Sequence, residues 1–327
     1  MGQKEPRRHH YVPELLLKNF ADLGGKLWGY DAVKRKKFCT DPQAAGVKAD
    51  FHTVRLKAGK IDRLTIEQML STRVEGPGKL ALTRLVNREE LTDQQALDFI
   101  QFVATQFVRT PTAFAQRSAL IAPTLQESLK RMAKFDAEYK RRVTERSAKK
   151  HSQEEIDRLF DHLQNGKILV VPTREFLLRL MLDQIIKVTK ELSRMRWNLA
   201  TLDDSDPDLI IGDHPVTLHD LAKKGARSTR ALGLRNANVE LMMPVSRRMA
   251  AIAYNSNELP PMYTLLESGT AEELNDRTMR AAQRFVYAST ESDEILKRFI
   301  QLHGTGPTVR TTKLPSGKGT LFTSELR

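Results

Sequence analysis

The chain has 327 residues, of which 40% are hydrophobic and 28% are charged. This apolar content is enough for a buried core, so a chain that is disordered throughout is excluded. The apolar runs are only a few residues long, whereas a membrane-spanning helix needs about 20, so no membrane span is expected. No apolar stretch follows the basic N-terminus, so we expect no signal peptide and a cytoplasmic protein.

Positive charge dominates the composition, with 53 Lys and Arg residues against 40 Asp and Glu and a net charge of +13. Such an excess favours a polyanionic partner, and nucleic acid is the first candidate. Each of the segments 1–40, 128–150, 223–248 and 297–327 carries five or six more basic than acidic side chains. These segments either converge on one groove or form separate solvated faces.

Residues 1–60 predict a short module that contains β-structure. A short helix begins at Pro13, because proline is tolerated in a first turn. The segments 26–31 and 36–40 predict the two strands of a hairpin, and a further strand is expected at 51–56.

Residues 61–196 predict helices, because apolar side chains recur at intervals of three and four, most clearly from Leu97 to Val108. Thr92 and Gln95 form a capping box ahead of that segment. Residues 197–303 contain short apolar runs separated by Asp, Gly and Pro, which predict a small mixed sheet followed by helices.

A second capping box is predicted at Thr270 and Glu273. Residues 304–327 lack periodicity and predict a flexible basic tail. We therefore expect a single, predominantly helical α+β domain over residues 1–303.

Four strings of the sequence resemble landmarks of a bacterial family known as domain of unknown function 4238. They are HHYVPELLLKNF at His9–Phe20, QFVRTP at Gln106–Pro111, GDHPV at Gly212–Val216 and MPVS at Met243–Ser246. The family usually has Asp-Asn-Pro where this chain has Asp213-His214-Pro215, and it has no settled activity. The resemblance covers nearly the whole chain and implies a shared fold and pocket, but no particular reaction.

Adjacent histidines precede the first helix. In an extended segment neighbouring side chains point to opposite sides, so only one of His9 and His10 faces a given site. A neutral imidazole there could accept a proton from water near pH 7 or bind a divalent metal. The alternative is one histidine packed in the core and the other in solvent.

The string HHYVP is also similar to the start of His-Me finger nucleases, in which a histidine activates water beside a metal. Those enzymes carry an Asn or a His on a following helix, and the helix expected near Leu64 lacks it.

Gln106 and Arg109 are three residues apart, so they share one face of an otherwise apolar helix. A guanidinium in such surroundings could hold a phosphate or a carboxylate through two parallel hydrogen bonds. The alternative is that Arg109 interacts with the carbonyl groups at the end of its helix. Glu75 is a metal ligand, the partner of Arg109 or a surface carboxylate.

Asp213 and His214 follow the apolar run 209–211, at the end of an expected strand, where sites commonly assemble. Asp213 could bind a metal or orient one of the N-terminal histidines, and His214 is counted with it as a metal ligand. The alternative is a turn in which Asp213 bonds its own backbone.

These observations favour a protein that acts on nucleic acid, with a metal-dependent nuclease of bacterial defence or toxin systems as the leading hypothesis. A histidine would activate water, Arg109 would hold the phosphate, and acidic side chains would bind Mg²⁺ or Mn²⁺. The candidate residues come from three parts of the chain: His9, His10, Glu75, Gln106, Arg109, Asp213 and His214.

Two alternatives remain, a non-catalytic nucleic-acid-binding module and a helical protein-interaction component, and the long helices also suggest a homodimer. Phosphate-loop, dinucleotide-binding, nucleophile-elbow and HExxH motifs are absent, which disfavours NTPases, dinucleotide oxidoreductases and common hydrolases. The single Cys39 excludes an internal disulfide and any multi-cysteine metal site.

Overall fold

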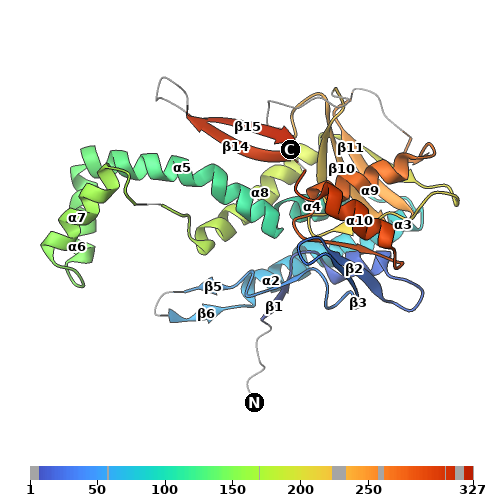
Figure 1. The fold of residues 1–327 in the computed structure, drawn as a ribbon, viewed down its shortest axis with the longest axis horizontal. Helices are drawn as coiled ribbons and strands as arrows, with labels where there is room; N and C mark the ends of the chain where they lie inside the picture. Colours follow the sequence, from blue (N-terminus) through green and yellow to red (C-terminus); the bar gives the residue numbers. More distant parts are fainter. Residues whose placement is uncertain are drawn as a thin grey trace, which may run out of the picture. The chain divides into compact units, whose positions relative to one another are not determined.

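A computed structural model of the chain has an α+β fold in which helices predominate, as the sequence predicts (Figure 1). It describes residues 7–56, 59–168, 170–222, 233–256, 261–305, 307–313 and 320–326, the last two ranges as backbone only. No helix in these ranges has both the length and the apolar character that crossing a membrane requires.

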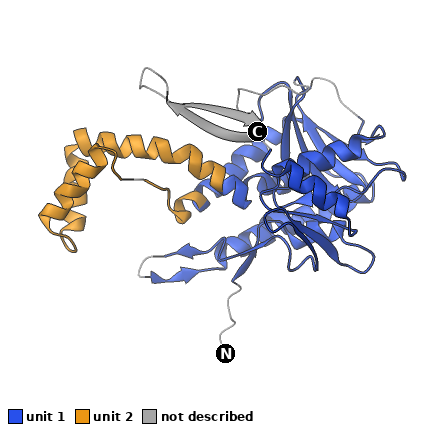
Figure 2. Ribbon diagram, viewed as in Figure 1, with its two compact units in different colours: residues 1–114, 178–327 blue, residues 115–177 orange. Residues whose placement is uncertain are grey.

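The chain divides into two compact units (Figure 2). Unit 1 contains residues 1–114 and 178–327, and unit 2 contains residues 115–177. The division therefore falls inside the segment 61–196 that was expected to be helical. One domain over residues 1–303 stays a prediction.

The helices of the chain alternate with its strands, and several follow one another directly. In unit 1 they are α1 (Glu14–Leu17), the 3-10 turn η1 (Lys18–Phe20), α2 (Thr65–Leu70), the π-helical turn η3 (Ser71–Glu75), α3 (Gly76–Val86), α4 (Asp93–Val108), α9 (Thr270–Ala281) and α10 (Asp293–Leu302). The boundary between the units falls within α5 (Pro111–Phe135) and α8 (Arg174–Leu192).

The C-terminal half contains the predicted mixed sheet, which has five strands. In spatial order they are β12 (Tyr263–Leu265), β7 (Arg196–Thr201), β11 (Met249–Tyr254), β10 (Val239–Ser246) and β9 (Thr217–Asp220). The pair β12–β7 is parallel and the other neighbours are antiparallel. Most residues of β10 and β11 are buried, which explains their nearly continuous apolar sequence.

The predicted N-terminal hairpin exists, but it is part of a larger sheet. Its strands β2 (Leu27–Asp31) and β3 (Lys36–Thr40) continue into β13 (Phe285–Ala288) and β8 (Ile211–Gly212). Strands from the two ends of the chain thus form one sheet. The strand predicted at 51–56 is reduced to β5 (Val54–Arg55), which pairs with β6 (Ile61–Asp62).

The string HHYVP is fixed by strand pairing and by a glycine. Strand β1 (Arg8–His10) pairs antiparallel with β4 (Val47–Ala49). The Gly46 carbonyl accepts hydrogen bonds from the N–H groups of Tyr11 and Val12. Gly46 has a φ of 61°, and a Cβ there would lie 2.9 Å from Val12 Cβ, so only glycine fits this approach.

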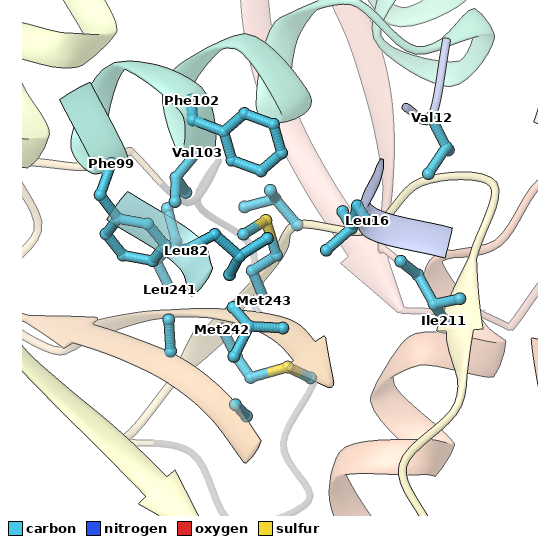
Figure 3. Close-up of a cluster of buried hydrophobic side chains, with 14 of the residues drawn as sticks. Val12, Leu16, Leu82, Phe99, Phe102, Val103, Ile211, Leu241, Met242 and Met243 are labelled. Carbon is cyan, nitrogen blue, oxygen red and sulfur yellow. The ribbon is translucent and has the colours of Figure 1, made fainter. Parts of the chain in front are cut away.

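The main core joins N-terminal, helical and sheet residues (Figure 3). Leu16 of α1 and Leu82 of α3 belong to the same buried cluster as Phe102 of α4 and Met243 of β10. Gly78 allows α3 to approach α4 closely, because a Cβ at this position would lie 2.8 Å from Phe102 Cβ. This packing places α1, α2 and α3 around the pocket described below.

Unit 2 has its own small core. Helices α6 (Ala137–Ser147) and α7 (Gln153–Gln164) follow α5, and Ile156 and Phe160 pack with Ala133. Ser152 and Glu155 form a capping box at the start of α7.

The C-terminal segment contains an antiparallel pair, β14 (Pro307–Lys313) and β15 (Thr320–Leu326). The side chains of this pair and residues 314–319 lie outside the described residues, as do residues 223–232 of another basic segment. The flexible tail and the convergence of the four basic segments therefore stay predictions.

Candidate active site

A polar face of the α2–α3 region forms one wall of a pocket. Ile66, Leu70 and Val74 are buried at intervals of four residues. The residues that follow two of them, Glu67 and Glu75, line the pocket. The same helical repeat thus buries one row of side chains and directs the neighbouring row towards the pocket.

The pocket has a volume of about 620 Å³ and is lined mainly by polar side chains of α1, η1, α2 and α3. Its ionisable lining residues are His10, Glu14, Lys18, Glu67, Glu75 and Lys79. Carboxylates, ammonium groups and an imidazole therefore surround one cavity.

The two adjacent histidines point to opposite sides of β1, as expected. His9 is fully buried, whereas His10 lines the pocket. Nε2 of His10 is shielded from water and has no hydrogen-bond partner among the described residues. Burial lowers the pKa of His10, and the charge of Arg109 lowers it further, so His10 is neutral at pH 7.

His9 belongs to a buried cluster with His52 and Glu67. Its Nδ1 accepts a hydrogen bond of 2.8 Å from the backbone N–H of His52 and lies 3.9 Å from Glu67 Oε1. Nδ1 of His52 shares a hydrogen bond with the same carboxylate oxygen. The two imidazole rings are stacked, with centroids 5.8 Å apart.

The cluster changes the ionisation of two of its members. Burial lowers the pKa of His52, although the hydrogen bond to Glu67 acts in the opposite direction. Burial by itself would raise the pKa of Glu67. The hydrogen bond to His52 and the charges of His52, His9 and Arg109 outweigh this effect, so the net result is a lowered pKa of Glu67. One carboxylate oxygen and two imidazole nitrogens thus meet in a small volume, as in many metal sites.

Arg109 and Glu75 form an ion pair, which was one of the three predicted roles of Glu75. Arg109 Nη1 lies 2.6 Å from Glu75 Oε1, and Arg109 Nε donates a hydrogen bond of 3.0 Å to the Tyr11 carbonyl. Arg109 is only 1% exposed, and its Nη2 has no partner among the described residues. The buried Arg109 therefore fixes the position of Glu75, which lines the pocket. A phosphate would have to compete with the Glu75 carboxylate for this guanidinium.

Gln106 is on the same helix but does not line the pocket. Its side chain is fully buried, and neither amide atom has a hydrogen-bond partner among the described residues. A buried amide normally has partners, so this side chain is conspicuous, but the structure gives it no direct contact with the pocket.

Asp213 is used by the backbone of another strand. Its carboxylate accepts hydrogen bonds of 2.7, 2.8 and 2.9 Å from the N–H groups of Gln283, Arg284 and Phe285. Burial raises the pKa of Asp213 to about 6, against the effect of these three donors. Asp213 does not line the pocket, so the structure does not bring it together with Glu75. The carboxylate bonds the backbone at the start of β13 and not its own turn, which differs from all three roles that the sequence suggested: metal ligand, partner of an N-terminal histidine and local turn.

His214 is buried away from the pocket. Its Nδ1 shares a hydrogen bond of 2.6 Å with Thr110 Oγ1, and its ring lies beside Phe107. Burial lowers the pKa of His214 to about 4, so the ring is neutral at pH 7. His214 is adjacent to Asp213, but the Asp213 carboxylate already accepts three backbone hydrogen bonds. The two side chains therefore do not form the predicted metal site.

Two members of the site, His52 and Glu67, were missed by sequence reasoning. The helix that begins near Leu64 carries a glutamate, Glu67, whereas the comparison with His-Me finger nucleases predicts Asn or His there. Glu67, Ser71 and Glu75 each follow one of the apolar residues Ile66, Leu70 and Val74. This four-residue repeat of polar side chains could have indicated a polar helix face that contains Glu67. His52 gave none, because it meets His9 only through folding.

The four distinctive strings of the sequence are connected in space. Arg109 contacts the carbonyl of Tyr11, and Thr110 contacts His214. Asn19 donates a hydrogen bond of 2.8 Å to the carbonyl of Val245. Each string thus contacts another one, and together they fix the region behind the pocket.

The fold and the site define an α+β protein with a polar, carboxylate-lined pocket backed by a buried histidine pair. The chain belongs to the family described as protein of unknown function (DUF4238), whose model matches residues 8–292. No curated protein and no solved structure matches the chain.

Proposed function

We propose that the chain is a phosphodiesterase that hydrolyses nucleic acid in the pocket lined by His10, Glu67 and Glu75. The observation that carries the proposal is a neutral, partnerless imidazole in the same pocket as two carboxylates, each of which is held by a buried basic side chain. Groups fixed in this way need little reorganisation during a reaction. The net charge of +13 supports a polyanionic substrate.

His10 is the proposed general base. The neutral imidazole ring, which lines the pocket, accepts a proton from a water molecule while the water oxygen forms a bond to phosphorus. The bond between phosphorus and the leaving oxygen breaks, and this oxygen takes a proton from solvent. Burial and Arg109 both lower the pKa of His10, which keeps the base unprotonated near neutral pH.

Three carboxylates line the pocket and would repel a phosphate, so the proposal requires a divalent cation, Mg²⁺ or Mn²⁺ in the first instance. Such an ion neutralises charge on the scissile phosphate when it is bound. Lys18 and Lys79 line the same pocket and supply further positive charge. Lys18 is also paired with Glu14 at 2.7 Å, which leaves Lys79 as the stronger candidate for a phosphate contact.

The test is cleavage of labelled single-stranded DNA, duplex DNA and RNA by the full chain with Mg²⁺, Mn²⁺ or Zn²⁺ and with EDTA. His10→Ala is expected to lower the cleavage rate by about 100-fold or more, because it removes the base. His151→Ala is the matched control, since His151 is an exposed histidine of unit 2 with a side chain 57% exposed.

Wild-type rates in His10→Ala would contradict the proposed base. Salt-dependent nucleic-acid binding without cleavage under any of these conditions would replace the proposal by a non-catalytic binding module. Neither binding nor cleavage, with elution as a hetero-complex, would favour the protein-interaction alternative. The defence or toxin setting is part of the proposal, and growth arrest on expression that His10→Ala relieves would support it.

A further inference from the structure

We propose that His9, His52 and Glu67 bind one divalent transition-metal ion of the Zn²⁺ or Mn²⁺ type. This inference rests on the proposed function, because it names the residues that hold the required cation. One ligand-type atom from each of the three side chains lies within 4.8 Å of the others. This set of ligands differs from the set predicted from the sequence, in which Glu75, Asp213 and His214 hold the metal.

The three residues come from separate elements that the fold brings together. His9 is in β1, His52 follows β4, and Glu67 is in α2. The histidines are 0% and 1% exposed, whereas the Glu67 side chain is 27% exposed and lines the pocket. Glu67 therefore gives an ion a route from the pocket to the two buried imidazoles.

The cluster also contains an unsatisfied buried atom. His52 Nε2 is shielded from water and has no hydrogen-bond partner among the described residues. Buried polar atoms are nearly always paired, so the cluster is incomplete as it stands. The other ring nitrogen of His52 is hydrogen-bonded to Glu67, and binding of an ion would exchange this hydrogen bond for a bond between the Glu67 carboxylate and the metal.

Only a small adjustment is needed for the three groups to share an ion. Two ligand atoms that each lie about 2.1 Å from a metal are at most about 4.2 Å apart. A separation of 4.8 Å would have to shorten by roughly 0.6 Å to meet that limit. Glu67 is the partly exposed member, so a change of its side-chain torsions supplies this movement without disturbing the core.

The donor set determines the class of metal. Two imidazoles and one carboxylate favour Zn²⁺, Fe²⁺ and related ions, whereas Mg²⁺ prefers oxygen ligands throughout. The expected order of affinity is therefore Zn²⁺, then Mn²⁺, then Mg²⁺. A site built only from the pocket carboxylates would have no imidazole ligands to favour Zn²⁺ over Mg²⁺. The order of affinity therefore distinguishes the two kinds of site.

The experiment measures Zn²⁺, Mn²⁺ and Mg²⁺ binding to the full chain by titration calorimetry in the absence of nucleic acid. One Zn²⁺ per chain is expected. Glu67→Gln should weaken the Zn²⁺ affinity by more than about 100-fold, since even substitution of a supporting residue costs 10- to 100-fold. Glu14→Gln, the same substitution at another pocket carboxylate, should retain it.

A second measurement does not depend on a variant. The electron spin-echo modulation of Mn²⁺ bound to the wild-type chain should contain couplings to imidazole nitrogen. Spectra without nitrogen coupling, no stoichiometric Zn²⁺ binding, or a Zn²⁺ affinity that Glu14→Gln lowers and Glu67→Gln does not, would each overturn the inference.

The failure of this inference is distinguishable from the failure of the proposed function. Zn²⁺ binding that depends on Glu67, in a chain that cleaves no nucleic acid, supports the metal site and overturns the nuclease. Cleavage that Glu67→Gln leaves unchanged, without Zn²⁺ binding, overturns the metal site and leaves the nuclease standing.

Discussion

At the scale of single residues, burial decides what each ionisable group can do. Arg109 is 1% exposed, whereas the Glu75 side chain opposite it is 23% exposed at the pocket. The two partners of one ion pair thus differ in their access to water. The cost of removing either partner depends on whether the group left behind can be hydrated.

We therefore expect Glu75→Ala to destabilise the protein more than Arg109→Met. The first change leaves a buried guanidinium without its counter-charge, which costs about 3–5 kcal/mol. The second leaves Glu75 free to be hydrated and one unpaired Tyr11 carbonyl, which costs about 1–3 kcal/mol. Urea unfolding of both variants and of the double mutant measures the difference, and the reverse order would show that Glu75 is the less hydrated partner.

His214 provides a prediction on pH dependence. Its pKa is lowered from 6.5 to about 4 in the folded chain, so the unfolded chain binds more protons between these values. The stability contribution of the neutral ring is present above pH 6.5 and is lost as the pH falls to 4. His214→Asn, which introduces the residue usual in the family, removes this loss.

The free energy of unfolding of wild type relative to His214→Asn should fall by about 3 kcal/mol between pH 7 and pH 4. Asp213 has a raised pKa, so it acts in the opposite direction, but it is present in both proteins and cancels in the comparison. Chemical denaturation at several pH values measures the difference. A constant difference would mean that His214 titrates normally.

At the scale of elements, the sequence predicts the start of a helix correctly where a side chain forms the N-cap hydrogen bond. The capping box of Thr92 and Gln95 is confirmed, with both reciprocal hydrogen bonds formed. The capping box predicted at Thr270 and Glu273 is wrong. Gly269, with a φ of 84° and no side chain, occupies the cap position, and Thr270 is already the first helical residue.

The contact between α3 and α4 gives a prediction at this scale. Gly78→Ala should destabilise the protein by about 1–3 kcal/mol, because the added Cβ forces the helix away from Phe102. Gly76→Ala in the same helix is the control. Its Cβ would approach no atom closer than 3.4 Å, so it should be neutral or stabilising by up to about 1 kcal/mol. Equal thermal shifts in the two variants would contradict the packing argument.

At the scale of the whole molecule, the strings that mark the family belong to one connected region of unit 1. The strand pairing of β2 with β13 and the contacts of Tyr11, His214 and Val245 join the N-terminal, middle and late parts of the chain. Unit 2 has its own core, so its stability is separable in principle from that of the pocket. The homodimer, like the nucleic-acid partner, stays a prediction.

The sequence by itself determined those features that depend on neighbours along the chain. The opposite directions of His9 and His10 and the hairpin at 27–31 and 36–40 both follow from the alternation of side chains along strands.

Only the tertiary structure decided which of these side chains meet. His9 and His52 are 43 residues apart, and Glu75 and Arg109 are 34 apart, so their contacts depend on closing long loops. Asp213 was expected at the site, but the backbone of 283–285 occupies its carboxylate. A sequence shows which groups could act, but the packing of distant segments determines which of them remain free to do so.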